Sequence, residues 1–429
     1  MQIRNMVSNL PNLVLSDNKG DIFNHPDFKM LGMANESLRL PQEEELIPLP
    51  KGSSLFYMPG YAARGFDPEN NSDVTIIEFR GKKVYPVGAF IIPGYTRVLL
   101  PAANKIDKKI ILPLWSYTAV GWAKGRFWVA GIKIDKRSRQ RPHYYEDMNL
   151  LKKNISLIVE AYPKNRLYKH LANCALNYNC RAAQNLYFSR WEAPLPTSPS
   201  CNANCLGCLS FQDSDCASAS HGRINFVPTP LEISQVAVNH FLNAKEAIAS
   251  FGQGCEGEPL LQFGTIKNSI KNIREAVSYG TIHLNTNAYN PGYLKELAKV
   301  GLDSVRISIN SFQNDFYNAY YRPRGYGLKD VLKSMEVSKK SGLFVSLNLL
   351  VFPGLTDTEA EIKILINLLR RGYVDLLQLR NLCIDQDYYI KNMPVVRQKA
   401  VGILNMIKLI QKAVPKIRFG YFNLPKEKF

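Results

Sequence analysis

The chain has 429 residues, of which 46% are hydrophobic, so it can bury a large core and wholesale disorder is excluded. Its formal net charge of +18 favours contact with polyanions such as nucleic acid, anionic lipid or acidic protein, without identifying one. No uncharged apolar run reaches the ~20 residues of a membrane span, and the N-terminus lacks a signal-peptide pattern. We therefore expect a cytoplasmic protein without membrane insertion, whose eight cysteines bind metal more readily than they form disulfides.

The first part of the chain predicts an arm and then a β-rich domain. Residues 1–50 are polar and interrupted by prolines, which predicts an extended N-terminal arm. Residues 51–190 contain short β-branched and aromatic runs divided by Gly and Pro, including a hairpin on either side of Ala-Lys-Gly at 123–125. Two helices, at about 146–159 and 167–183, then connect this β-rich N-terminal domain to the next region.

Residues 191–390 alternate strands with helices, which is typical of parallel βα units. One strand before a cysteine-rich loop joins five later ones, at 247–252, 281–287, 305–310, 343–352 and 374–382. Capping boxes at Thr229–Glu232 and Thr356–Glu359 are expected to begin two of the helices. We predict an α/β fold, an incomplete (β/α)6 barrel with a β-rich N-terminal domain, followed by a C-terminal helix and tail at 391–429. In such barrels the loops after the strands carry the chemistry.

The strongest chemical signal is the C-x3-C-x2-C motif of Cys201, Cys205 and Cys208. Three thiolates this close can hold three irons of a cubane cluster and leave the fourth iron open to a small molecule. Zinc is the alternative, since Cys216 could supply a fourth ligand. Zinc sites usually contain paired C-x2-C motifs, and only one such pair is present, so the spacing favours the cluster.

This loop and the segments after it, from about residue 196 to 385, resemble the radical S-adenosylmethionine (radical SAM) superfamily. The family's glycine- and glutamate-rich strand end resembles residues 251–260, which implies that Gly257, Glu258 and Pro259 hold the methionine part of S-adenosyl-L-methionine. Later strand ends resemble further cofactor-binding positions, namely Thr286, Asn287, Arg306, Ser308, Asn310 and Asn348. There are departures, since Gly207 stands where an aromatic residue is common, Ala288 replaces a glycine, and Cys255-Glu256 interrupts a Gly-Gly-Glu run.

The resemblance implies an enzyme with a 4Fe–4S cluster that cleaves S-adenosylmethionine reductively and abstracts hydrogen from a substrate. The sequence does not name that substrate, but the charge and the extra domain favour a macromolecule, either RNA or protein. A reductant protein such as a ferredoxin or flavodoxin is the implied partner. The alternative is a non-catalytic iron–sulfur or zinc protein that binds nucleic acid.

The remaining cysteines allow two readings each. Cys255 ends a predicted strand directly before Glu256, so its thiol is the candidate catalytic group, able to donate hydrogen to a substrate radical; it could equally be a buried apolar side chain. Cys174 and Cys180 are spaced so that they share a helix face poorly. We expect them to be packed thiols rather than ligands of an auxiliary cluster.

Overall fold

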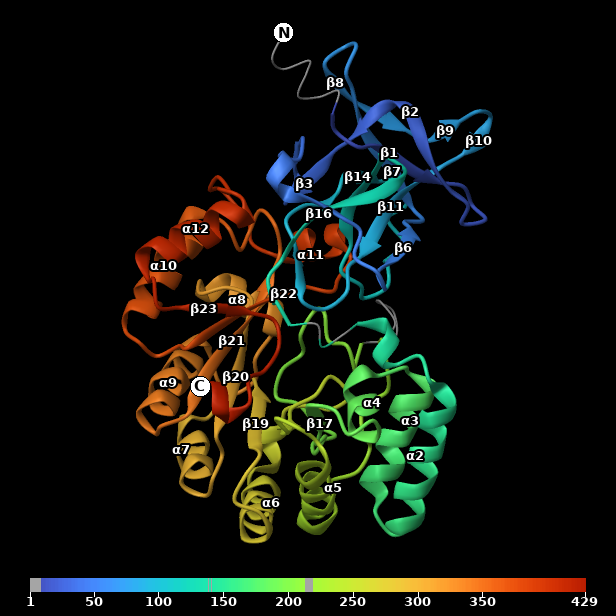
Figure 1. Cartoon of the computed structure of the whole chain (residues 1–429). Helices are drawn as coiled ribbons and strands as arrows, with labels where there is room; N and C mark the ends of the chain where they lie inside the picture. Colours follow the sequence, from blue (N-terminus) through green and yellow to red (C-terminus); the bar gives the residue numbers. More distant parts are fainter. Residues whose placement is uncertain (1–8, 138, 140, 213–218) are drawn as a thin grey trace.

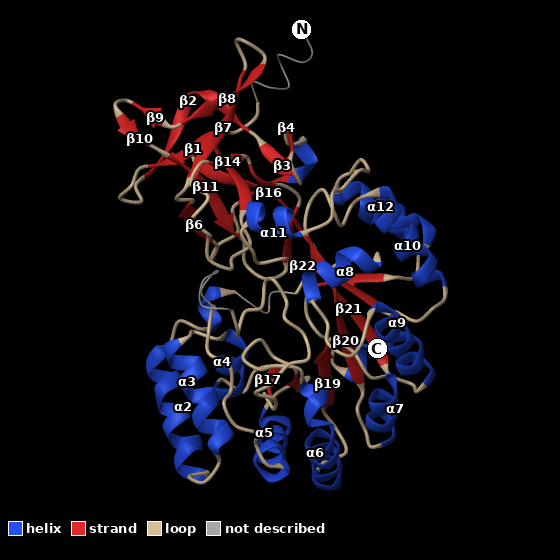
Figure 2. Ribbon diagram, turned by 180° about the vertical axis from the view of Figure 1, so that it is seen from behind, coloured by secondary structure: helices blue, strands red, loops and turns tan. Residues whose placement is uncertain are grey.

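The computed structural model describes residues 9–137, 139, 141–212 and 219–429, and it consists of two parts packed together (Figures 1 and 2). A β-rich N-terminal part lies across one end of a larger α/β part. A group of three helices, α2–α4, lies beside the first strand of the α/β sheet. Within the described ranges every helix is too short or too polar to cross a membrane.

The β-rich part is built on an antiparallel sheet around β1 (Asn12–Ser16), which pairs with β2 (Ile22–Met30), β11 (Tyr85–Phe90) and β15 (Thr118–Ala123). The predicted hairpin is confirmed by the pairing of β15 with β16 (Arg126–Lys133). The same sheet contains β5 (Leu46–Pro48), β6 (Ser54–Tyr57), β7 (Tyr61–Asp67), β8 (Ser72–Ile76), β12 (Tyr95–Arg97) and β14 (Ala103–Lys105). Two smaller sheets hold β3 (Gly32–Ala34), β4 (Ser37–Arg39) and β13 (Leu100–Pro101), and β9 (Glu78–Phe79) with β10 (Lys82–Lys83).

Residues 9–50 differ from the extended arm that their prolines predicted. They form β1 to β5 and a short 3-10 helix, Glu43–Glu45, and β1 lies inside the main sheet. Pro26 is accommodated in β2 where the pairing with β1 shifts register, and the His25 ring accepts the N–H groups of Asp27 and Phe28 there. The prolines therefore interrupt the strands without preventing them, because burial of residues such as Val14 stabilises the pairing.

The α/β part contains, over the described residues, seven parallel strands that pair in chain order. They are β17 (Glu192–Pro194), β18 (Ile248–Phe251), β19 (Thr281–Thr286), β20 (Ser304–Ile309), β21 (Phe344–Val351), β22 (Leu376–Asn381) and β23 (Arg418–Gly420). Helices α5 (Pro230–Asn243), α6 (Phe263–Ala276), α7 (Pro291–Lys299), α9 (Leu328–Lys340) and α10 (Glu359–Arg370) lie along the outer face (Figure 1). The α/β class with a β-rich N-terminal region is confirmed, and β23, from the predicted tail, adds a strand to the six expected.

One predicted capping box is confirmed and the other is wrong. Thr229 Oγ1 accepts the Glu232 N–H, and the Glu232 carboxylate accepts the Thr229 N–H, so α5 begins as predicted. Thr356 instead uses its hydroxyl to accept the Phe352 N–H at 2.9 Å. Helix α10 therefore begins at Glu359, after a turn that the sequence pattern did not separate from a helix start.

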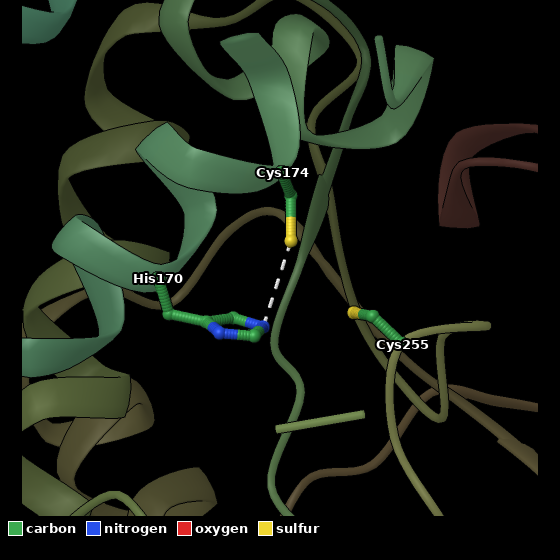
Figure 3. Close-up of side chains that lie close together, drawn as sticks. All are labelled: His170, Cys174 and Cys255. Atoms are coloured by element: carbon green, nitrogen blue, oxygen red, sulfur yellow. Dashed lines mark hydrogen bonds between the residues drawn. The ribbon is translucent and has the colours of Figure 1, made fainter. Parts of the chain in front are cut away.

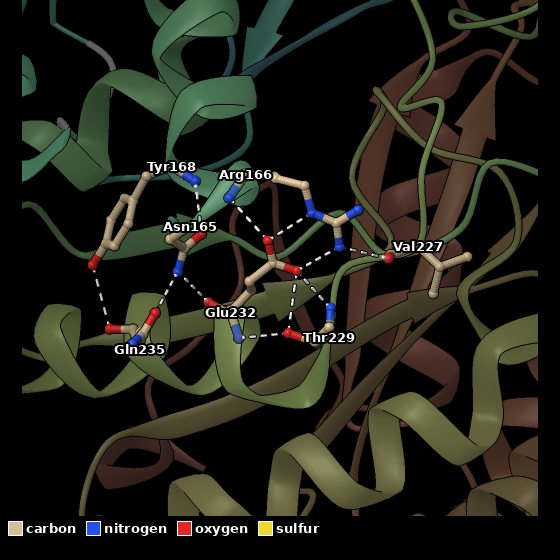
Figure 4. A network of polar contacts seen from close by, with 7 residues as sticks. All are labelled: Asn165, Arg166, Tyr168, Val227, Thr229, Glu232 and Gln235. Atoms are coloured by element: carbon tan, nitrogen blue, oxygen red, sulfur yellow. Dashed lines mark hydrogen bonds and ion pairs between the residues drawn. The ribbon is translucent and has the colours of Figure 1, made fainter. Parts of the chain in front are cut away.

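The single helix expected over 167–183 is divided into α3 (Arg166–Asn177) and α4 (Arg181–Tyr187), with Asn179 between them in the left-handed region (φ 48°). Helix α2 (Met148–Ala161) precedes them. The start of α3 is fixed to α5, because Arg166 makes two hydrogen bonds to the Glu232 carboxylate, at 2.8 and 2.7 Å (Figure 4). This contact lowers the pKa of Glu232 to about 2 and holds α3 in a fixed position against the sheet.

The two parts meet through buried polar groups beyond the end of β22. The fully buried Arg97 guanidinium donates to the Leu382 carbonyl at 2.8 Å, and the Arg97 N–H donates to Asn381 Oδ1 at 2.8 Å. The Tyr61 hydroxyl donates to Asp385 at 2.6 Å, just before α11 (Gln386–Asn392). The β-rich part is thus bonded to the strand ends of the sheet, the edge at which a parallel α/β fold places its site.

Candidate active site

The loop with the three predicted cluster ligands follows β17 and is held from two sides. The backbone N–H groups of Asn204 and Leu206 donate to carbonyls at the end of α8 (Asn314–Tyr321), each at 3.0 Å. Ala203 forms an isolated bridge with Pro323. Gly207 is tightly packed, because a Cβ there would lie 3.1 Å from the Tyr320 hydroxyl and 3.2 Å from the Cys383 carbonyl oxygen, so a larger residue would require these neighbours to shift.

The three thiols of this loop influence one another. Burial raises the pKa of Cys201 to about 11 and raises that of Cys205 further, and the neighbouring thiolates add to both effects. Within the described part of the chain these three sulfurs do not gather inside 4.8 Å, the spacing at which three side chains could share a single ion. Cys216, the fourth ligand of the zinc alternative, lies outside the described residues.

Arg223 is a residue that the sequence analysis missed. Its guanidinium donates to Cys208 Sγ at 3.5 Å and to Ser210 Oγ at 3.2 Å, and its charge offsets part of the rise that burial causes in the pKa of Cys201. A cation beside three thiolates favours their deprotonated, metal-binding form. Nothing in the sequence around Arg223 distinguishes it from the many surface arginines, because only the folded loop brings it to the cysteines.

The loop that follows β18 packs directly on the cysteine loop. The N–H groups of Gly257 and Glu258 donate to the Ser198 and Ser200 carbonyls at 2.7 and 2.9 Å. A Cβ at Gly257 would lie 1.9 Å from the Ser200 oxygen, so only glycine fits there. Gly252, with φ 75°, is equally constrained, since a Cβ would lie 1.7 Å from a β19 carbonyl oxygen.

Glu256, which interrupts the Gly-Gly-Glu pattern, joins the two loops. One carboxylate oxygen accepts the N–H groups of Thr197 and Ser198, at 2.7 and 3.0 Å, and the other accepts those of Gly252 and Gln253, at 2.6 and 3.0 Å. Burial raises the pKa of Glu256 to about 7. A residue that looked like a departure from the motif is therefore the connection that holds the cysteine loop to the end of β18.

The structure brings Glu258, Thr286 and Asn287 together beside the cysteine loop. The Glu258 carboxylate accepts the Thr286 hydroxyl and the Asn287 N–H, at 2.5 and 2.8 Å, and burial raises its pKa to about 7. The Asn287 amide donates to Asn202 Oδ1 at 2.7 Å, which ties the end of β19 to that loop. Pro259 directly follows Glu258 in the chain and begins the short 3-10 helix Pro259–Gln262.

Arg306, Ser308 and Asn348 form a second group on β20 and β21. The Asn348 amide donates to Ser308 Oγ at 3.1 Å, and Arg306 donates to Gln378 Oε1 at 3.2 Å. Arg306 Nε and Asn348 Oδ1 are buried and, among the described residues, lack a hydrogen-bond partner. Buried polar atoms normally have partners, so these two atoms are suited to a polar ligand. Burial lowers the pKa of Arg306 to about 9.

Two predicted site residues, Asn310 and Cys255, have other surroundings, and the backbone at Ala288 bears on the departure noted there. The Asn310 amide donates to the Phe316 carbonyl at 3.1 Å and so supports α8. Ala288 adopts the left-handed conformation (φ 58°), which favours the glycine that the family resemblance implies at this position. The Cys255 thiol is buried beside Cys174 and His170 at the α3 side of the sheet (Figure 3).

Residues 195–365 match the family model of the radical SAM superfamily. This domain belongs to the radical SAM superfamily. The matched range contains the cysteine loop and the Glu258 group, so the resemblance read from the motifs is confirmed. Radical SAM enzymes use a [4Fe–4S] cluster and S-adenosylmethionine, and these are the cofactors that the domain implies.

Relatives of the radical SAM domain differ in what they do. A GTP 3′,8-cyclase from Petrotoga mobilis is 33% identical over 107 residues, which are 24% of this chain and 32% of that protein. The chain thus matches about a third of that relative's length. Among solved structures, HydG, a maturase of the [FeFe]-hydrogenase, has a TM-score of 0.38 at 17% identity, covering 66% of this chain and 63% of that one. A radical SAM methyltransferase from Sphaerobacter thermophilus has a TM-score of 0.39 at 14% identity, covering 54% and 65%.

The residues present fit these cofactors. Three thiols supply one ligand too few for a four-iron cluster, which leaves one iron for a small molecule. Arg223 supports the thiolates, the Gly257 backbone approaches the loop closely, and Arg306 Nε and Asn348 Oδ1 have unused hydrogen-bonding capacity. A carboxylate at Glu258 can accept hydrogen bonds from the ammonium group of an amino acid.

Proposed function

We propose that the chain is a radical SAM enzyme whose cluster is held by Cys201, Cys205 and Cys208. When bound, the cluster and S-adenosylmethionine supply the reductive cleavage and the radical that abstracts hydrogen from a substrate. The contact network between the cysteine loop and the Gly257–Glu258 segment supports this proposal, because it ties the Glu258 carboxylate and the Gly257 backbone to the loop that contains the three thiols.

The protein's own residues position the cofactors and exclude water. Glu258 and Asn287 are assigned to the methionine end of S-adenosylmethionine, while Arg306, Ser308 and Asn348 are assigned to its carboxylate or ribose, as the family resemblance implies. Cys255 stays a candidate hydrogen donor in this scheme. The β-rich part, bonded through Arg97 and Asp385 to the strand ends of the sheet, is placed to cover the site.

The substrate class follows from charge and from the additional β-rich part. A net charge of +18 favours an anionic macromolecule, with RNA preferred over protein, because electrostatic attraction acts on the phosphate backbone. A ferredoxin or flavodoxin is the proposed electron donor, and the incomplete (β/α)6 barrel, extended by β23, is the proposed description of the sheet. The cytoplasm is the proposed location.

Anaerobic reconstitution with iron and sulfide tests the assignment. The protein should take up about four irons per chain and release 5′-deoxyadenosine from S-adenosylmethionine when reduced. Substitution of Cys201, Cys205 and Cys208 by Ala together should abolish both the iron uptake and the product. Replacing Cys383, whose thiol donates to the Asn381 carbonyl and lies near Ser116, provides the control.

The same measurements can also contradict the radical SAM proposal. Stoichiometric zinc at the triad without iron uptake, or a reconstituted cluster that neither binds nor cleaves S-adenosylmethionine, would favour the non-catalytic nucleic-acid-binding alternative. Because Cys383→Ala removes a thiol without touching the three proposed ligands, loss of iron in that variant would show that the reconstitution reports general instability.

A further inference from the structure

A second group of metal-binding side chains lies away from the cysteine loop. His170 and Cys174 are four residues apart on α3 and therefore share one face of the helix. Cys255, from the loop after β18, faces them, and one ligand atom from each of the three lies within 4.8 Å of the others (Figure 3). In the part of the chain that the structure describes, this is the one group of three His, Cys, Asp or Glu side chains gathered so closely.

The spacing of these atoms suits a single ion. Zinc binds Cys sulfur at about 2.3 Å and His nitrogen at about 2.0 Å, which places tetrahedral ligand atoms roughly 3.5–3.8 Å apart. His170 Nε2 and Cys174 Sγ are 3.6 Å apart. A four-iron cluster needs its ligands further apart, because irons and sulfides must fit between them.

The three side chains are held in place before any ion binds. Arg166, at the start of α3, is fixed to Glu232 of α5 (Figure 4). The Tyr187 hydroxyl of α4 donates to the Tyr168 carbonyl at 2.6 Å, so the first turn of α3 is held by both α5 and α4. On the opposite side the Cys255 carbonyl accepts the Ile224 N–H at 2.8 Å. Such preorganisation lowers the cost of assembling a metal site.

We propose that His170, Cys174 and Cys255 bind one zinc ion, separate from the iron–sulfur cluster. A cavity of about 220 Å³ adjoins them and is lined by Cys180 and His221. The fourth coordination position faces this cavity, where either side chain or a water molecule completes the tetrahedron. Cys174 is then a metal ligand and not the packed thiol expected from its spacing to Cys180. The second ligand on the same helix face is His170, four residues earlier.

The ion would connect helix α3 to the loop that follows β18. Cys255 directly precedes Glu256, whose carboxylate holds the cysteine loop. A metal bond from Cys255 to α3 would therefore fix the helix group against the strand end that carries Glu258. This assignment gives Cys255 a structural role, which excludes its thiol from donating hydrogen to a substrate radical while the ion is bound.

Metal analysis of the full-length protein tests the proposal directly. Protein produced with zinc and purified anaerobically should contain about one zinc per chain in addition to cluster iron. Cys174→Ser and Cys255→Ser should each lose that zinc and keep the iron, whereas Ala at Cys201, Cys205 and Cys208 should lose the iron and keep the zinc. Cobalt substitution should give thiolate charge-transfer and tetrahedral ligand-field absorption in the wild-type protein, and Cys383→Ser should match wild type.

Two results would overturn the zinc site. The first is wild-type protein that takes up neither zinc nor cobalt, a measurement that does not depend on the folding of any variant. The second is iron well above four per chain that is lost from Cys174→Ser, which would indicate an auxiliary cluster. Because iron and zinc are measured separately, failure here leaves the cluster assignment at Cys201, Cys205 and Cys208 untouched.

Discussion

Glu256 accepts four backbone N–H groups from two loops, and no other residue type can do this at the same place. In Glu256→Gln one carboxylate oxygen becomes an amide nitrogen that faces N–H donors. We expect a loss of roughly 2–4 kcal/mol of unfolding free energy, since charged hydrogen bonds are removed and two donors are left without an acceptor. Thermal unfolding should show a lower Tm and easier loss of iron, whereas the exposed control Glu44→Gln should not change.

An unchanged Tm in Glu256→Gln would mean that the two loops are held by other contacts.

The partners of Glu256 show why its position looked like a departure from the motif. A Glu between Cys and Gly reads as a disturbance of a cofactor motif, but its partners are N–H groups from a different loop, 58 and 59 residues earlier.

Glu258 allows a test of the cofactor assignment itself. Glu258→Gln should keep the cluster but weaken S-adenosylmethionine binding by about 1.5–3 kcal/mol, because a charged acceptor is lost. Burial raises the pKa of Glu258 to about 7, so the carboxylate is mostly neutral below that pH and charged above it. Wild-type affinity should therefore rise from about pH 6 to about pH 8, and the affinity of Glu258→Gln should lack this rise.

Equilibrium binding to the reconstituted, oxidised protein measures this affinity without turnover. Thr286→Val removes a hydroxyl that donates to Glu258 and leaves its charge, so it should lower affinity less than Glu258→Gln does. Equal affinity of wild type and Glu258→Gln at both pH values would assign Glu258 to the support of the β19 end alone.

At the scale of elements, β12 and β22 connect the two parts of the molecule. Arg97 on β12 is fully buried and donates to carbonyls at the ends of β21 and β22, while burial lowers its pKa to about 10. Arg97→Met fills similar space but removes the donor to the Leu382 carbonyl, whereas the Val351 carbonyl keeps the Leu382 N–H; the loss should cost about 2–5 kcal/mol. Thermal unfolding should show a clear decrease in Tm, and the exposed control Arg141→Met should stay near wild type.

A Tm of Arg97→Met equal to wild type would show that the β-rich part is held by Tyr61 and Asp385 without Arg97.

Helices and strands were predicted correctly where neighbouring residues alone specify them, as for α5 and the hairpin of β15 and β16. It failed for β1 to β5, because their stability comes from pairing with strands far along the chain.

At the scale of the whole molecule, the C-terminal segment after β23 joins three regions. The Asn423 amide donates to Glu192 of β17 at 2.7 Å, and the Lys426 N–H donates to Thr281 of β19 at 2.8 Å. The Tyr421 N–H donates to Asp135, after β16, at 3.0 Å. These bonds cross between the two edge strands of the sheet and reach the β-rich part.

Deletion of residues 421–429 should therefore loosen the whole protein. We expect a lower Tm and faster proteolysis in both parts, and a smaller effect of the same sign for Asn423→Ala, since Glu192 loses one of its partners. Val395→Ala, at a side chain that is 81% exposed, is the control. Proteolysis limited to the α/β part would show that the segment does not connect it to the β-rich part.

The sequence by itself determined the α/β class, the cysteine loop and the order of the strand-end motifs, because these depend on residue spacing along the chain. Gly257 and Glu258 could be assigned to the candidate site for the same reason. Only the tertiary structure decided the partners of Glu256 and the approach of Arg223 to Cys208, since these residues are distant from their partners in the chain or carry no local pattern. The same holds for His170, Cys174 and Cys255, which lie on a helix and a strand end and meet only when α3 packs against the sheet.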